Sequence, residues 1–298
     1  MHKPVLLNEV INLLDIQSDD VVLDGTVGGG GYLKAICHRV GKEGIVIGLD
    51  QDNSALEKAK SEISSRNYIC QTYLLNKNFR NMDKVLDKLK IEKADKIVFD
   101  LGFSSDQLEN SGRGFSFQKD ERLVMTLKDN LTDTDLTAEE IVNNWDEENL
   151  ADIIFGYGDE KFSRQIAREI CEVRKEKKIE TTFELVEIIK RAVPKWYQFK
   201  KIHCATKTFQ ALRITVNDEI ETLKNGLEKG FEYLNKGGRM AVVSFHSRED
   251  KIVKNFFRRK KDEGRGILIT KKPATPSVEE LRENPCARSA KLRVIEKC

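Results

Sequence analysis

The sequence predicts an α/β protein with a helical domain inserted into its sheet. Short apolar runs alternate with helical stretches of about 10–15 residues, which is the pattern of parallel strands joined by helical crossovers. These first strand candidates are 21–24, 45–49, 68–75 and 97–99. No strand candidate follows until 239–245, 266–270 and 291–296. We therefore expect an α/β domain made of 1–101 and 207–298, and an inserted domain of 102–206 after the fourth strand.

The helices are predicted from apolar periodicity and from signals at their ends. They lie near 31–39, 54–65 and 80–90 and, after a polar loop over 102–128, at 136–144, 147–155, 160–175 and 182–193. Thr181 and Glu184 have capping-box spacing at the start of the last one. Between Phe209 and Leu234 apolar residues recur every three or four positions, so we expect one long helix there, and another follows near 248–261.

The composition argues against a membrane span, a disulfide scaffold and a metal centre. Apolar residues make up 39% and charged residues 34%, and runs such as Met240–Val243 are far shorter than the roughly 20 residues of a membrane helix. Glu9 comes too early for a signal peptide. The six cysteines form no C-x-x-C pair and the four histidines have no metal-ligand spacing. We expect a cytoplasmic protein that holds no metal and contacts no membrane.

The net charge of +2 hides an uneven distribution. Residues 239–298 contain 16 Lys/Arg against 8 Asp/Glu, and residues 161–206 contain 12 against 6. Residues 128–160 contain one basic residue against 11 acidic ones. The basic segments favour a polyanionic partner, although solvated helix faces would account for the same charges.

The strongest local motif is a glycine-rich loop that follows the first strand. Asp24 ends that strand, Gly28 to Gly31 follow, and Asp50 ends the next strand. An acid at the end of the second strand of a doubly wound sheet binds ribose hydroxyls, so the ligand is a dinucleotide or S-adenosylmethionine. The loop does not match G-x-G-x-x-G, and Asp24 would repel a pyrophosphate while facing the cationic end of S-adenosylmethionine. The methyl donor is favoured, and a nicotinamide-dependent oxidoreductase is the alternative.

Seven further motifs, spread along the chain, resemble one family. They are His2 to Glu9, Asp100 to Leu108, Arg113 to Phe117, Tyr157 to Phe162, Phe209 to Ile214, Ser244 to Ser247 and Arg288 to Arg293. The chain resembles the MraW-type methyltransferases, which use S-adenosylmethionine to methylate the exocyclic N4 of a cytidine in small-subunit (16S) ribosomal RNA. The resemblance implies a class I, Rossmann-like methyltransferase sheet with an inserted helical domain over 102–206 that recognises the substrate.

The resemblance also implies which residues hold the methyl donor. Gly30, Gly31 and Tyr32 would hold it in the loop. The remaining donor contacts that the resemblance implies are Asp50 at the ribose, Phe79 beside the adenine, and Asp100 and Gln107 at and after the fourth strand.

Five positions depart from the family pattern. Tyr32 occupies a position where the family usually has His, and Val124 and Thr126 occupy positions where it has Asp and Arg. Cys204 replaces a usual Pro, and Arg248 replaces a usual Leu. The donor motif is intact, whereas the segment around Val124 and Thr126 is altered. A divergent paralogue with a shifted RNA substrate, or a non-catalytic RNA-binding or assembly factor, is therefore the alternative function.

Methyl transfer to cytidine N4 calls for a hydrogen-bond acceptor that takes the amino proton. Asp100 is the catalytic candidate, and His246, at the end of the fifth strand, is a second group that would contact the base or a phosphate. The cytidine must be unpaired or extruded to be reached. The partner is small-subunit ribosomal RNA or the assembled small subunit, and the oligomeric state, a homodimer included, stays open.

The RNA contacts are predicted from aromatic and basic side chains. The residues concerned are Phe103, Arg113, Phe115 and Phe117 in the polar loop, and Lys254, Arg258, Arg259, Lys260 and Lys261 after the fifth strand. The aromatic rings would stack on bases and the cations would contact phosphates. Packing under the loop and a solvated helix face are the alternative interpretations.

Overall fold

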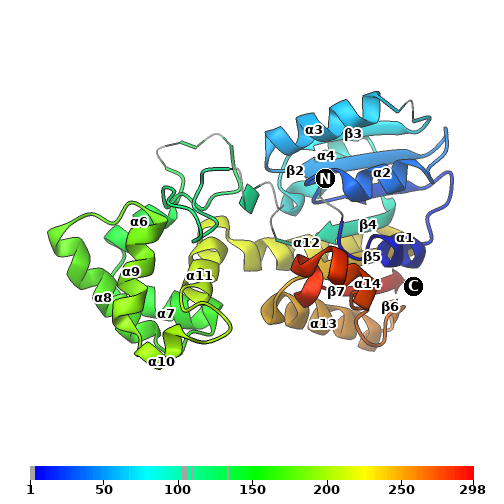
Figure 1. Cartoon of the computed structure of the whole chain (residues 1–298). Coiled ribbons are helices and arrows are strands. Elements are labelled where there is room, and N and C mark those ends of the chain that lie inside the picture. The colour runs from blue at the N-terminus through cyan, green and yellow to red at the C-terminus, as the bar shows by residue number, and fades with distance from the viewer. Residues whose placement is uncertain (1–3, 67, 103–106, 109–110, 130, 133) are drawn as a thin grey trace. The chain divides into compact units, whose positions relative to one another are not determined.

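The chain forms two compact units. The computed structural model describes residues 4–66, 68–102, 107–108, 111–129, 131–132 and 134–298. Met1–Phe103 and Ile220–Cys298 make an α/β unit, and Ser104–Glu219 make a helical unit (Figure 1). The interrupted sheet that the sequence predicts is thus built from both ends of the chain.

The α/β unit contains a seven-stranded sheet in the order β3-β2-β1-β4-β5-β7-β6. Its strands are β1 (Val21–Asp24), β2 (Ile45–Asp50), β3 (Gln71–Asn76), β4 (Ala94–Asp100), β5 (Leu234–Ser244), β6 (Gly266–Leu268) and β7 (Lys291–Lys297). The first five strands are parallel, and β7 runs antiparallel to both β5 and β6. The predicted α/β class is confirmed.

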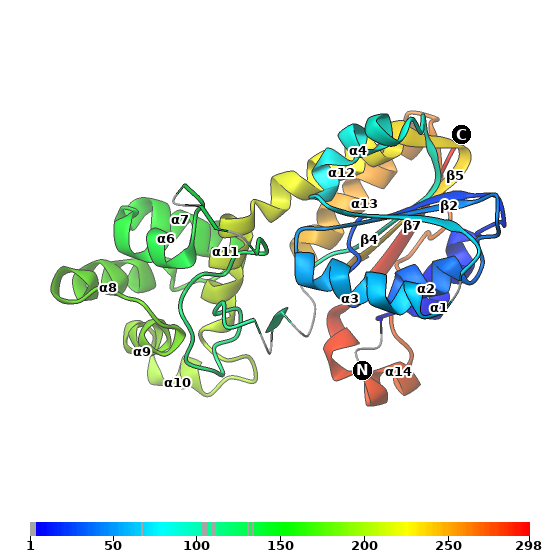
Figure 2. The ribbon, with the colours of Figure 1, turned by 90° about the horizontal axis from the view of Figure 1, so that it is seen from above.

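Helices cover both faces of this sheet (Figure 2). One face carries α1 (Leu7–Leu14), α2 (Gly31–Cys37) and α3 (Asn53–Ser64), and the other carries α4 (Met82–Leu89), α12 (Glu219–Tyr233) and α13 (Ser247–Asp262). Because alternate strand residues point to opposite faces, Val22 and Val46 belong to the first core whereas Leu23 and Ile47 belong to the second. The short helices are η1 (Phe79–Asn81), α14 (Val278–Glu283) and η2 (Pro285–Ser289).

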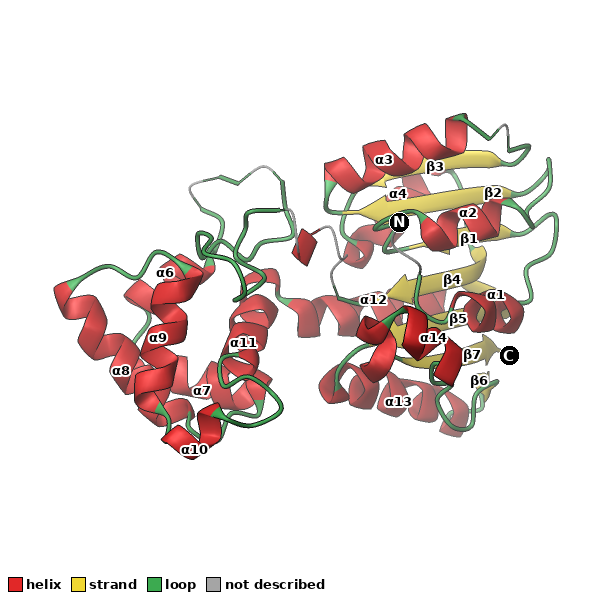
Figure 3. Ribbon diagram, in the orientation of Figure 1, coloured by secondary structure: helices red, strands yellow, loops and turns green. Residues whose placement is uncertain are grey.

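The helical unit consists of helices and loops (Figure 3). It has its own apolar core. Its helices are α6 (Ala138–Asn144), α7 (Glu147–Gly158), α8 (Ser163–Glu176), α9 (Thr182–Ala192), α10 (Lys195–Gln198) and α11 (Thr206–Asn217). The predicted capping box is present at the start of α9, where the Thr181 hydroxyl accepts from the Glu184 N–H and the Glu184 carboxylate accepts from the Thr181 N–H.

The prediction of a single helix from Phe209 to Leu234 is wrong. The segment forms two helices, α11 and α12, which are separated at Asp218. This residue adopts a left-handed conformation (φ 49°) and caps α11 through its N–H. Phe209 and Leu212 of α11 lie in the core of the helical unit, whereas Leu223 and Leu227 of α12 pack on the sheet. The chain therefore returns from the helical unit to the α/β unit after Glu219, and not between residues 206 and 207 as predicted. Apolar periodicity runs through the break and does not reveal it.

Candidate functional site

Three parallel strands end in an aspartate at the same edge of the sheet. β1 ends at Asp24, β2 at Asp50 and β4 at Asp100, and β1 pairs with both of the other strands. We call these three residues the aspartate edge. The chain order reverses between β1 and β4, and in doubly wound sheets the ligand crevice opens at such a reversal, outside the carboxyl ends of the strands.

Asp24 is fully buried and only partly satisfied. One carboxylate oxygen accepts from the Thr26 N–H (3.0 Å), while Oδ2 has no hydrogen-bond partner among the described residues. The pKa of Asp24 is raised to about 7, mainly by burial; the Thr26 N–H opposes this shift and the charge of Asp50 adds to it. A buried carboxylate oxygen without a donor is costly, so this position suits a cationic or N–H group of a ligand.

Asp100 repeats this arrangement at the end of the neighbouring strand. Its backbone N–H donates to the Thr26 hydroxyl (2.6 Å), but its buried Oδ1 has no partner among the described residues. Burial raises the pKa of Asp100 well above its ordinary value, and the charges of Asp24 and Glu249 add to this shift. Two neighbouring carboxyl groups whose pKa values are both raised by burial and by nearby carboxylates create a site that favours positive charge.

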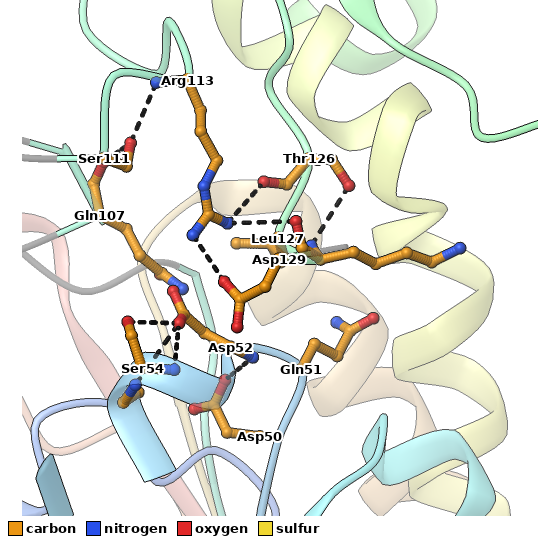
Figure 4. Close-up of polar contacts among 12 residues, drawn as sticks. Asp50, Gln51, Asp52, Ser54, Gln107, Ser111, Arg113, Thr126, Leu127 and Asp129 are labelled. Carbon is orange, nitrogen blue, oxygen red and sulfur yellow. Dashed lines mark hydrogen bonds and ion pairs between the residues drawn. The ribbon is translucent and has the colours of Figure 1, made fainter. Parts of the chain in front are cut away.

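Asp50 is held in place by backbone N–H groups. Its Oδ2 accepts from Gly28 (2.7 Å) and its Oδ1 from Asp52 (2.9 Å). Asp52 in turn caps α3 by accepting from the N–H (3.0 Å) and hydroxyl (2.6 Å) of Ser54 (Figure 4). Burial raises the pKa of Asp50. Each oxygen keeps a further lone pair, which is what binding to two ribose hydroxyls requires.

The glycine-rich loop is shaped by close packing. Gly30 has φ +73° and precedes α2, and a Cβ on Gly31 would collide with the Pro4 ring. Tyr32 is 3% exposed, and its hydroxyl donates to the Val5 carbonyl. Burial raises the pKa of Tyr32, with the charges of Asp100 and Asp24 as the next causes. Tyr32 therefore ties the N-terminal segment to the loop beside the aspartates.

Phe79 lies in the core between the sheet and α12. Its ring stacks on Phe99 with centroids 4.7 Å apart, and a Cβ on Gly226 would collide with it. The side chain is 9% exposed, so its predicted contact with an adenine would use the part of the ring that remains exposed.

Two other predicted residues follow β4 in the sequence. Gln107 belongs to the helical unit, where its carbonyl accepts from the Ser111 hydroxyl. Phe103 lies outside the described residues.

His246 is a helix cap in this structure. Its Nδ1 accepts from the Glu249 N–H (3.3 Å), and the Glu249 carboxylate accepts from the N–H groups of Phe245 and His246. His246 Nε2 lies 3.2 Å from Glu249 Oε1. This capping box at the start of α13 gives the imidazole a structural role, and its predicted catalytic role stays a prediction.

The predicted base-stacking residues of the polar loop pack inside the helical unit. Phe115 is 7% exposed and belongs to the core. Phe117 stacks on His203 (centroids 4.8 Å apart) and meets Phe209 edge-on. The buried Phe115 is therefore used for packing, whereas Phe117 is half-buried and its predicted stacking on a base stays a prediction.

Arg113 is bound within its own unit. Its guanidinium donates to the Asp129 carboxylate (2.8 Å) and to the Thr126 carbonyl (3.1 Å) (Figure 4). Asn217 holds the same segment by accepting from the Leu127 N–H (2.8 Å) and donating to the Met125 carbonyl (2.8 Å). The altered segment is thus well anchored.

The other departures from the family pattern have local explanations in part. Thr126 is buried and its hydroxyl accepts from the Lys128 N–H, while Cys204 is buried in the helical core. Val124 donates its N–H to the Arg122 carbonyl. Nothing in the structure explains why Arg248 stands where the family has a leucine.

Two of the five predicted phosphate contacts on α13 are satisfied by protein groups. Lys260 is 4% exposed, and its Nζ lies 3.1 Å from Glu228 Oε2 and over the rings of Phe231 and Phe256. Arg259 also pairs with Glu228. The prediction is wrong for Lys260. The remaining three cations, Lys254, Arg258 and Lys261, are exposed.

The predicted phosphate contacts in the last turn of α13 also need a correction of their position. α13 starts just after the carboxyl end of β5 and its 16 residues span about 24 Å. Lys260 contacts Phe231, which lies in the last turn of α12, three residues before β5 begins at Leu234. Residues 258–261 therefore lie at the sheet edge opposite to the aspartate edge.

Two contributors to the site are missed by sequence reasoning. Thr26 links the ends of β1 and β4 through its hydroxyl, and Pro4–Val5 packs on the glycine-rich loop. Thr26 lies inside the glycine motif, so its position is detectable from sequence. The contacts of Pro4 and Val5 join residues distant in sequence, and no local pattern indicates them.

The fold and the aspartate edge define an α/β enzyme that binds an adenosine-type ligand, and the comparisons identify its class as a methyltransferase. The family model of the MraW methylase family matches residues 1–298, and the chain belongs to this family. The alternative of a nicotinamide-dependent oxidoreductase is thereby excluded, and the methyl donor is S-adenosylmethionine.

Curated relatives share nearly half of their residues with this chain. "Ribosomal RNA small subunit methyltransferase H" of Clostridium botulinum (strain Kyoto / Type A2) is 44% identical over 99% of this chain and 98% of its own. The protein of the same name from Acetivibrio thermocellus is 45% identical over the same shares. A crystal structure of a candidate rRNA-methylase from Clostridium thermocellum has a TM-score of 0.50 at 16% identity over the full length of both chains, a likeness of fold. No helix among the described residues could cross a membrane.

Proposed function

We propose that this enzyme methylates the exocyclic N4 of a cytidine in small-subunit ribosomal RNA. The relatives' names support the RNA, and the motifs around Asp100 and Arg113 support the base and the atom. One observation carries the proposal: buried, unpartnered carboxylate oxygens on Asp24 and Asp100, among the described residues, at the reversal point of the sheet. Such an enzyme acts in the cytoplasm, on the RNA or on the assembled small subunit.

The side chains and glycines at the aspartate edge fit S-adenosylmethionine as the methyl donor. Asp24 would face the cationic amino-acid end, because its free oxygen is the one buried acceptor of β1 without a donor among the described residues. Asp50 would take the ribose, since its carboxylate is fixed by Gly28 and Asp52. Gly30 and Gly31 would line the loop. When bound, this cofactor supplies an electrophilic methyl group with a neutral leaving group.

Three further donor contacts rest on the resemblance. Tyr32 would line the pocket beside the aspartates, Phe79 would border the adenine, and Gln107 would reach the donor from the loop after β4. The structure leaves each of these as a prediction.

Asp100 is proposed as the acceptor of the N4 proton. Its pKa is raised by burial and by neighbouring carboxylates, so it exchanges a proton at a higher pH than an exposed aspartate. A cation bound beside it would lower that pKa and ionise the group before transfer. The Asp100 carboxylate would then hold the amino N–H, direct its lone pair and receive the proton.

The test is methylation by the purified protein. Small-subunit RNA and assembled small subunits from a strain lacking this protein would be incubated with S-adenosylmethionine, and nucleosides would be measured by mass spectrometry. We expect N4-methylcytidine in one of the two substrates. No methylated nucleoside in either, together with tight binding of S-adenosylhomocysteine, would indicate the non-catalytic assembly factor. A different modified nucleoside would indicate a shifted substrate.

A further inference from the structure

The helix α10 belongs to the helical unit (Figure 3). The chain around it carries exposed aromatic and basic side chains. No acidic residue occurs between Glu187 and Asp218, although the stretch holds seven Lys/Arg. Within it, Trp196 is 54% exposed and Phe199 is 86% exposed. We call the following six exposed residues the aromatic–basic surface: Lys161, Lys195, Trp196, Phe199, Lys200 and Lys201.

Two of the four cations of this surface lie close to the indole of Trp196. Lys161 Nζ is 4.6 Å and Lys200 Nζ 5.1 Å from the centroid of a Trp196 ring. Among the described residues, no ion pair involves Lys161, Lys195, Lys200 or Lys201. The positive charge is therefore uncompensated locally and available to a polyanion.

The backbone that carries these side chains is anchored from below. The hydroxyl of Tyr197 donates to Glu160 Oε2 (2.6 Å), and both side chains are buried. Gln198 Nε2 donates to the Lys190 carbonyl (2.7 Å), and the Tyr197 ring meets Phe162 edge-on. Trp196 and Phe199 are thus presented by a fixed turn, which lowers the entropy lost when a ligand binds.

We propose that the aromatic–basic surface binds a single-stranded segment of RNA. Bases would stack on Trp196 and Phe199, while Lys195, Lys200 and Lys201 contact phosphates. Exposed aromatics interleaved with unpaired cations are the recognised combination for unpaired nucleic acid, since stacking needs bases that are not already in a duplex. The inference rests on the proposed function for the identity of the RNA and names the surface of the helical unit that recognises it.

The test measures RNA affinity of the full-length protein loaded with S-adenosylhomocysteine. The probe is a short fluorescein-labelled single-stranded RNA, followed by anisotropy at several salt concentrations. Trp196→Ala with Phe199→Ala should weaken binding by about fivefold or more for each base that stacks. Lys200→Ala with Lys201→Ala should reduce the slope of log K against log salt by about 1.4, or 0.7 for each phosphate that a lysine no longer neutralises.

Matched controls separate a local effect from loss of structure. Lys175, Lys177 and Lys178 are exposed lysines of the same unit that pair with Glu172, Glu184 and Glu139, and their triple alanine variant should bind RNA as the wild type does. Thermal melting and affinity for S-adenosylhomocysteine should stay unchanged in all variants. Affinity within twofold of the wild type for the Trp196/Phe199 variant would overturn the inference.

Tryptophan fluorescence gives an independent readout. The chain has two tryptophans, so Trp145→Phe leaves Trp196 as the single emitter. Stacking should quench it with single-stranded RNA and much less with a duplex. If the Trp196/Phe199 variant instead turns a dimer into a monomer in sedimentation and keeps its RNA affinity, the surface joins two copies and the inference fails. RNA binding without methylation would refute the proposed function alone.

Discussion

The aspartate edge and the last turn of α13 both gather charge of one sign, but they differ in whether that charge is satisfied. At the aspartate edge, Asp24 and Asp100 each keep a buried oxygen without a partner among the described residues. On α13, Lys260 and Arg259 are neutralised by Glu228. Unsatisfied buried charge marks a ligand site, whereas paired charge stabilises the fold.

The strongest test of the aspartate edge is Asp100→Asn. We expect methyl transfer to fall by about 100-fold to 10,000-fold, because the amide cannot accept the proton from N4. Turnover on small-subunit RNA measures this loss, and affinity for S-adenosylhomocysteine checks that the donor pocket persists. Asp87→Asn, an exposed aspartate on α4, is the control. A variant with more than a third of the wild-type turnover would remove Asp100 from the chemistry.

Asp24→Asn should separate binding from stability. The pKa of Asp24 is about 7 in the folded protein against an ordinary 3.8, so the fold binds this proton more tightly than the unfolded chain does. The carboxyl costs no stability below about pH 4 and destabilises the donor-free fold as the pH rises to 7, by up to about 4 kcal/mol.

We therefore expect Asp24→Asn to raise the Tm of the donor-free protein at pH 8, to leave it unchanged near pH 4, and to abolish tight donor binding. Denaturation at several pH values and calorimetry with S-adenosylhomocysteine measure the two effects. If the variant is less stable at pH 8, Asp24 has a satisfied partner in the donor-free fold.

Asp50→Ala should have a smaller and more specific effect. Removing a charged hydrogen-bond acceptor from the ribose costs about 1.5–3 kcal/mol, or roughly 10-fold to 150-fold in donor affinity. RNA affinity should change little. Loss of both affinities together would contradict the division between a donor site in the α/β unit and RNA contacts elsewhere.

The same contrast explains what the sequence predicts well. Asp24, Asp50 and Asp100 each end an apolar strand, so local order along the chain places them at one edge. Lys260 is misassigned from sequence because its partner, Glu228, lies on another helix, and no charge count along α13 includes it. The break at Asp218 escapes prediction because the apolar period of α11 continues into α12, and only packing on two different cores divides them.

The smallest effect is expected on α13, and it tests the other side of the comparison. We consider the three exposed cations Lys254, Arg258 and Lys261. Replacing all three by Glu should weaken RNA binding by about threefold at most and change the salt dependence little. The reason is that residues 258–261 lie at the sheet edge opposite to the aspartate edge. Lys260→Ala should lower the Tm instead, because it removes a buried cation from between Glu228, Phe231 and Phe256. Anisotropy and thermal melting distinguish these outcomes. A salt slope reduced by about two or more in the charge-reversal variant would return the RNA contact to α13.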